Sequence, residues 1–89
     1  MAVDRVRRAA RPGIEPYEVL QVLYGGHRRP VLVRHPHGVV LLSIWGRTQA
    51  GRLLIVTVRP VGGFDSQIVG ARDLTSDERE EFESWENSR

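Results

Sequence analysis

The chain has 89 residues, the length of one small domain, and contains no cysteine, which excludes a disulfide scaffold and a thiolate metal site. Its apolar runs are far shorter than the ~18 residues that span a bilayer, and its first residues lack the apolar core of a secretory leader. The composition therefore predicts a soluble protein of the cytoplasm.

Charge is distributed unevenly along the chain. Residues 1–72 hold eleven arginines against four acidic residues, a net charge of +7, whereas residues 73–89 hold seven acidic residues against two arginines, a net charge of −5. Apart from the histidines, every basic side chain is an arginine, whose planar guanidinium suits phosphate and carboxylate ligands. This asymmetry indicates either a basic face for an acidic partner or two surfaces of the chain that neutralise each other.

Residues 1–13 are interpreted as a basic arm ahead of a single domain at 14–89. Within DRVRRAAR, arginines stand at helical neighbour spacings before Pro12 and Gly13 end the pattern. The arm is either a short helix or a loose tail, and its arginines could bind phosphate or an acidic segment of a partner.

The segment EPYEVLQVLYGG at 15–26 predicts the first helix of the domain. Pro16 suits the first turn of a helix, and the two glycines at the end of the segment would terminate it. Val19, Leu20 and Leu23 make one apolar stripe, so this helix is expected to pack on another element.

Four β segments are predicted after this helix, at 30–34, 39–46, 52–59 and 67–72, with a polar loop of hairpin length after the second and a turn around 61–63 after the third. Alternation within the third segment places Leu54, Val56 and Val58 on one face, with Leu53 and Ile55 on the other. The expected fold class is α+β, a small antiparallel sheet of three to four strands with helices packed against one face.

The last predicted element is an acidic helix that follows Leu74. Thr75 and Glu78 have the spacing of a capping box, in which each residue binds the backbone amide of the other. Phe82 and Trp85 are the only large apolar side chains of this helix, so it is expected to dock by a narrow stripe. Its acidic side chains are expected to be solvated; alternatively, they could mimic phosphate and shield the arginines.

Two stretches, GRTQAGRLLIVTV at 46–58 and IVGARDLTSDER at 68–79, resemble the C-terminal two-thirds of the BrnT-like toxins, small members of the RelE/ParE superfamily. Residues 13–23 are similar to the short helix that precedes the sheet in that family. The resemblance implies a compact curved antiparallel sheet with packed helices. It also implies a type II toxin-antitoxin function: a toxin that cleaves RNA, free or ribosome-bound, and a cognate antitoxin protein that neutralises it.

The resemblance also implies roles for individual residues. The arginine that opens the long strand in the family matches Arg52, and the arginine before the last helix matches Arg72, so both are candidate catalytic residues. The Thr and Glu that follow match Thr75 and Glu78, which would cap the helix or orient Arg72. Two positions depart from the family pattern, since Gln67 and Pro12 stand where basic residues are usual; both changes remove groups that could contact RNA.

Arginine chemistry supports the same candidates. Cleavage through a ribose 2′-hydroxyl concentrates negative charge on the phosphate, which preorganised guanidinium groups can stabilise. Arg47 and Arg59 are therefore predicted to bind RNA beside Arg52 and Arg72, and Arg59 could replace the charge lost at Gln67. Arginine binds and polarises well but is a poor proton shuttle at neutral pH.

Each candidate also has a structural interpretation. The arginines could simply pair with the acidic helix and its approach, through Asp73, Glu78 and Glu81. His35 and His37 could share a metal ion, but the sequence offers no evident third ligand, so a solvated turn without metal or cofactor is expected.

Three functional classes remain open from the sequence. The first is a metal-independent endoribonuclease toxin, and the second is a non-catalytic protein- or nucleic-acid-binding module that kept the fold and lost the nuclease. The third is a homodimeric scaffold, because the segment at 39–46 is apolar on both faces. Trp45 and Trp85 could stack on RNA bases, although packing in the core is the expectation.

Overall fold

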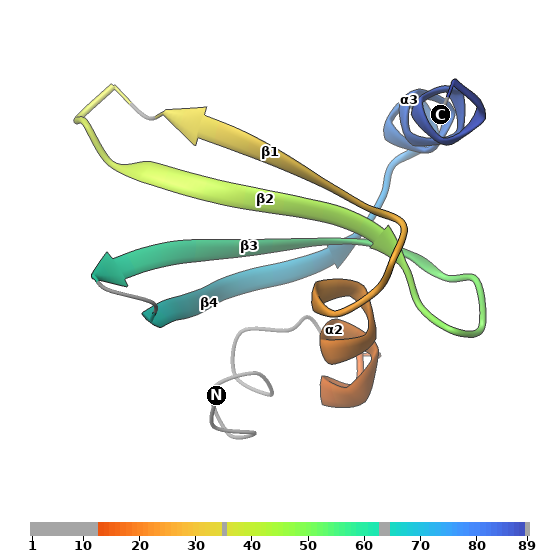
Figure 1. The fold of residues 1–89 in the computed structure, drawn as a ribbon, viewed down its shortest axis with the longest axis horizontal. Helices are drawn as coiled ribbons and strands as arrows, with labels where there is room; N and C mark the ends of the chain where they lie inside the picture. Colours follow the sequence, from red (N-terminus) through yellow and green to blue (C-terminus); the bar gives the residue numbers. More distant parts are fainter. Residues whose placement is uncertain (1–12, 35, 63–64, 89) are drawn as a thin grey trace.

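The computed structural model describes residues 13–34, 36–62 and 65–88. Its elements are, in chain order, α2 (Pro16–Leu23), β1 (Arg28–Arg34), β2 (Val40–Arg47), β3 (Leu53–Gly62), β4 (Asp65–Asp73) and α3 (Ser76–Asn87). The four strands form one antiparallel sheet in the order β1-β2-β3-β4 (Figure 1). This confirms the predicted α+β class. Apart from Gly13, the predicted basic arm lies outside the described residues.

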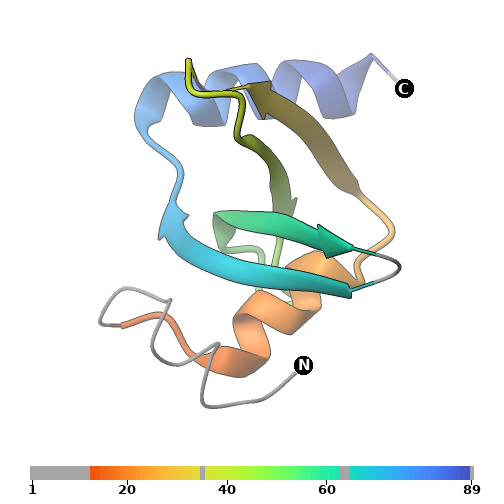
Figure 2. The same ribbon diagram turned by 90° about the vertical axis from the view of Figure 1, so that its left-hand side faces the viewer.

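The two helices cover opposite faces of the sheet, and Figure 2 shows the sheet between them. The larger core lies on the α2 side and consists of Ile14, Val19, Val22, Leu23, Ile44, Leu54, Val56, Val58, Ile68 and Ala71. The smaller core lies on the α3 side and consists of Leu53, Ile55, Leu74 and Phe82, with Trp45 and Trp85 packed against it. The prediction that the helices share one face is therefore wrong. Because β3 is apolar on both faces, each face needs its own cover.

Helix α2 begins as predicted and packs closely on the sheet. Pro16 is its first residue, and the Glu18 carboxylate accepts a hydrogen bond from the Glu15 amide at 3.0 Å, which caps the N-terminus. Val22 is fully buried while Leu20, which was expected in the apolar stripe, is only half-buried. The contact with β2 depends on Gly46, where an added Cβ would lie 3.1 Å from the Val22 side chain.

Strand β3 extends beyond its predicted end. It continues to Gly62, so residues 61 and 62, which were predicted to lie in a turn, belong to the strand. The ladder with β2 ends at Val58, and beyond it β3 pairs only with β4. One edge of the strand is then unpaired, which makes Pro60 tolerable although proline cannot donate to a ladder.

Candidate anion-binding face

Three arginines from three different strands lie on the side of the sheet that α3 covers. One row across the sheet, from β1 to β4, consists of Arg29, Trp45, Ile55 and Arg72. Arg47 lies two residues further along β2 and therefore points to the same side. The register thus gathers three guanidinium groups around an apolar centre, and we call this surface the arginine face.

Arg72 is held by the helix that follows it. Its two terminal nitrogens donate to the two carboxylate oxygens of Glu78 at 2.7 and 2.8 Å. Glu78 also accepts from the Thr75 amide at 2.9 Å, and its own amide donates to the Thr75 hydroxyl at 3.2 Å. This confirms the predicted capping box and the predicted pairing of Arg72 with α3. One carboxylate therefore both starts the helix and orients the arginine.

The other two arginines of the face pair with α3 as well. Arg47 donates from Nε and Nη2 to the carboxylate of Glu86, with a shortest distance of 2.8 Å. Arg29 donates to Glu81 at 3.3 Å and lies over the Trp45 ring, 5.4 Å from its centroid. On this side of the described chain, the basic sheet and the acidic helix therefore neutralise each other, which is one of the two arrangements that the charge asymmetry predicts.

Two of these ion pairs, Arg72 with Glu78 and Arg47 with Glu86, shift the pKa values of their groups so that the charged forms are favoured. Hydrogen bonding from Arg72 lowers the pKa of Glu78 to about 2, and hydrogen bonding from Arg47 lowers the pKa of Glu86. The same carboxylates raise the pKa values of Arg72 and Arg47. Such groups can bind and polarise an anion, but they do not exchange protons in the neutral range.

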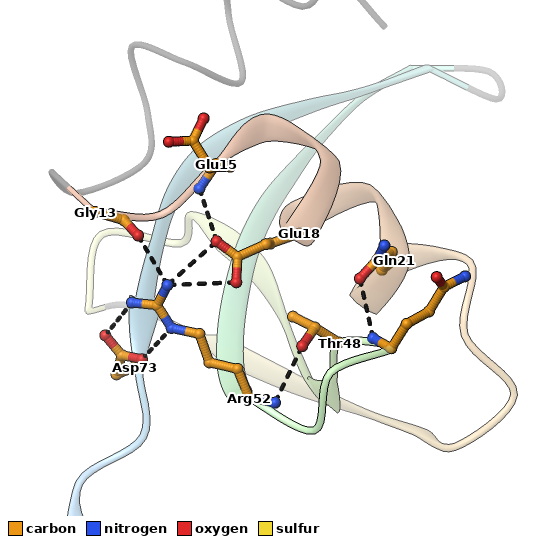
Figure 3. A network of polar contacts seen from close by, with 8 residues as sticks. Gly13, Glu15, Glu18, Gln21, Thr48, Arg52 and Asp73 are labelled. Carbon is orange, nitrogen blue, oxygen red and sulfur yellow. Dashed lines mark hydrogen bonds and ion pairs between the residues drawn. The ribbon is translucent and has the colours of Figure 1, made fainter.

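Arg52 lies at the edge of this region and serves as the centre of a separate network (Figure 3). Its guanidinium donates to both oxygens of Asp73 at 2.8 and 3.0 Å, to the Gly13 carbonyl at 2.8 Å, and to Glu18 at 3.2 Å. The Asp73 carbonyl also accepts from Arg72 at 3.1 Å, so the two predicted catalytic arginines meet at one residue. Arg52 thereby joins the start of α2 to the end of β4.

The remaining predicted site residues lie elsewhere. Arg59 is exposed and opposite Gln67, four residues beyond Ile55 along β3, so it lies roughly 13 Å from the row that defines the arginine face. His37 is exposed, whereas His35 is outside the described residues. Within the described ranges no three His, Asp or Glu side chains are grouped as metal ligands, and neither helix is long and apolar enough to cross a membrane.

Arg29 of the arginine face and Glu86 of α3 were not among the predicted site residues. Glu86 follows Glu78 and Phe82 at intervals of four, so helical spacing could have placed it on the docked side of α3. Arg29 required the register of β1 against β2, which no local pattern supplies.

No family model, no curated protein and no solved structure matches the chain. The geometry of the arginine face suits oxyanions, since each of its three guanidinium groups holds a carboxylate of α3.

Proposed function

We propose that the chain is the toxin component of a type II toxin-antitoxin pair that acts on RNA through the arginine face. One observation carries this proposal: Arg29, Arg47 and Arg72 come from three strands and lie on one side of the sheet, each bound to a carboxylate. The resemblance of residues 46–58 and 68–79 to the BrnT-like toxins supports it, since those stretches include Arg47 and Arg72.

Arg72 is assigned the chemical role. In cleavage through the 2′-hydroxyl, the attacking oxygen adds to the phosphate and the 5′-oxygen of the next nucleotide leaves, so charge grows on the phosphoryl oxygens. The guanidinium of Arg72 forms a fork with the Glu78 carboxylate while α3 is docked, and it can form the same fork with a phosphate once the helix separates from the sheet. Arg52 is assigned a positioning role instead, because its bonds to Asp73, Glu18 and Gly13 join the end of β4 to the start of α2 and do not involve α3.

A second candidate is a non-catalytic module that binds nucleic acid or protein. The observation that favours it is that Arg52 and Arg72, the two candidate catalytic residues, are both held in ion pairs within the chain. A binding surface needs only charge and shape, whereas cleavage also needs a group that accepts and returns a proton.

Induced expression in bacteria separates the two candidates. The toxin proposal expects growth arrest with shortened transcripts. Arg72→Ala should abolish the arrest while lowering the melting temperature little, because its pair with Glu78 is partly exposed. Arg79→Ala is the matched control, since Arg79 is an exposed arginine of α3, the helix that carries Glu78, and this variant should arrest growth like the wild type. Normal growth on induction of the wild type would favour the binding module; arrest by a destabilised Arg72→Ala variant would give Arg72 a structural role.

A further inference from the structure

Helix α3 is attached to the rest of the chain more lightly than any other described element. It docks through side chains alone, with Phe82 fully buried and Trp85 half-buried as its large apolar contacts. Leu74 and Thr75 connect it to β4. Regions with few buried apolar contacts open at a lower free energy than the global core, so α3 can separate while the sheet stays folded.

The docked side of α3 carries three carboxylates at its rim. Glu78, Glu81 and Glu86 each meet a different arginine, on β4, β1 and β2 respectively. The other three acidic side chains of the helix, Asp77, Glu80 and Glu83, are exposed. The helix therefore presents two sets of equal charge, one facing the sheet and one facing solvent, and only the first set occupies the guanidinium groups.

A guanidinium group that binds a carboxylate in a fork can bind a phosphate in the same way. The arginine face presents two such groups, Arg47 and Arg72, and a third guanidinium, that of Arg29, lies over the Trp45 ring. A base can stack on an aromatic ring while arginines hold the backbone. With α3 docked, this ligand cannot enter, because carboxylates and the Phe82 ring fill the positions above the sheet.

We infer that the arginine face is a binding site for the phosphodiester backbone of single-stranded nucleic acid, and that α3 covers this site by placing Glu78, Glu81 and Glu86 where phosphates bind. The inference rests on the proposed function in one respect, namely that RNA is the nucleic acid bound in the cell. It requires neither cleavage nor growth arrest, so it can succeed or fail separately.

The test compares two variants of the full chain that remove three negative charges each. The inner variant is Glu78→Gln, Glu81→Gln and Glu86→Gln; glutamine at position 78 keeps the capping box. The outer variant is Asp77→Asn, Glu80→Gln and Glu83→Gln. Binding of a short fluorescein-labelled single-stranded RNA is followed by fluorescence anisotropy over a series of salt concentrations. Circular dichroism melting verifies that each variant is folded.

The inner variant should bind the RNA about tenfold more tightly than the wild type. Its plot of log K against log salt should be steeper by about 2, since each of three freed arginines neutralises a phosphate and displaces counterions from the RNA. The outer variant should gain at most about twofold, because its carboxylates form no ion pair with the three arginines and act on them only through the longer-range field, as Glu83 does on Arg47. Adding Arg29→Ala, Arg47→Ala and Arg72→Ala to the inner variant should remove the gain. The same oligonucleotide as DNA identifies which backbone binds, and a gain with either supports the site.

Equal binding by folded inner and outer variants would overturn the inference, and so would a gain that survives loss of the three arginines. A third contrary result is selective binding of a synthetic peptide of residues 74–88 to the inner variant with no gain for nucleic acid, which would make the face a groove for an acidic helix. If the inner variant does not fold, the double variant Glu81→Gln and Glu86→Gln takes its place, with an expected gain of about threefold.

Discussion

The two sides of the sheet are stabilised in different ways. On the α2 side, ten buried apolar residues form a continuous core, and the Arg52 network closes one end of it. On the α3 side, four buried residues form a small core framed by three partly exposed ion pairs. Apolar burial is neither weakened by charge screening nor titrated by pH, whereas exposed ion pairs are sensitive to both. The comparison indicates that α2 belongs to the global core and that α3 is a separable unit.

Truncation of the α2-side core should have the largest effect. Leu54 is fully buried beneath α2, so Leu54→Ala should lower the free energy of unfolding by about 3–4 kcal/mol. Far-UV circular dichroism and tryptophan fluorescence should then report one transition in urea. Leu32→Ala, on an exposed leucine of β1, is the control and should cost under about 0.5 kcal/mol. Similar losses for both variants would contradict a core centred on the α2 side.

Truncation of the α3-side core should release α3 without unfolding the sheet. Phe82→Ala removes the only fully buried side chain of α3 and should lower the free energy of unfolding by about 2–3 kcal/mol. This is less than most buried Phe→Ala substitutions cost, ~3–5 kcal/mol, because the sheet stays folded when the helix separates. Both tryptophans pack on this side, so fluorescence should change at lower urea than circular dichroism. Coincident transitions would show that α3 is not separable. Tyr24→Ala, on an exposed aromatic at the end of α2, serves as the control.

Much of this fold follows from patterns within short segments. The alternation of Leu53 to Val58 assigned the two faces of β3 correctly, and the Thr75 to Glu78 spacing located the start of α3. The face of the sheet on which each helix packs could not be predicted from these patterns. Alternation shows that β3 has two apolar faces, but it does not show which helix covers which face. The extension of β3 past Pro60 depends on where β2 stops pairing, which is a tertiary property.

The site divides in the same way. Arg72 and Glu78 are six residues apart, so their pairing could be proposed from adjacency in the sequence. Arg29 and Glu81 are 52 residues apart, and their contact depends on strand register and on the direction in which α3 crosses the sheet. Sequence reasoning therefore found the local half of the arginine face and missed the half that folding assembles.

The arginine pairs offer a finer comparison of the two sides. Arg52→Ala leaves Glu18, whose side chain is only 12% exposed, without its cation, and it also releases Asp73 and the Gly13 carbonyl. We expect a loss of about 1–2 kcal/mol in the free energy of unfolding. Arg29→Ala breaks a pair with Glu81, whose side chain is 57% exposed, and should cost about 0.5 kcal/mol or less. Urea denaturation of both variants measures the difference, and the reverse order would contradict the positioning role of Arg52.

A similarly small effect should appear in acid, on the α3 side. Because Arg72 lowers the pKa of Glu78 from 4.5 to about 2, the unfolded chain takes up a proton at a higher pH than the folded chain does. This stabilisation is therefore complete above about pH 4.5 and is lost as the pH falls towards 2. Since both side chains are partly exposed, solvent screening limits its size to about 0.5–1 kcal/mol. Glu78→Gln should flatten the fall in stability across this window, whereas Glu80→Gln, on the exposed side of α3, should preserve it. Parallel pH profiles for the two variants would mean that the pair with Arg72 does not hold α3 in place.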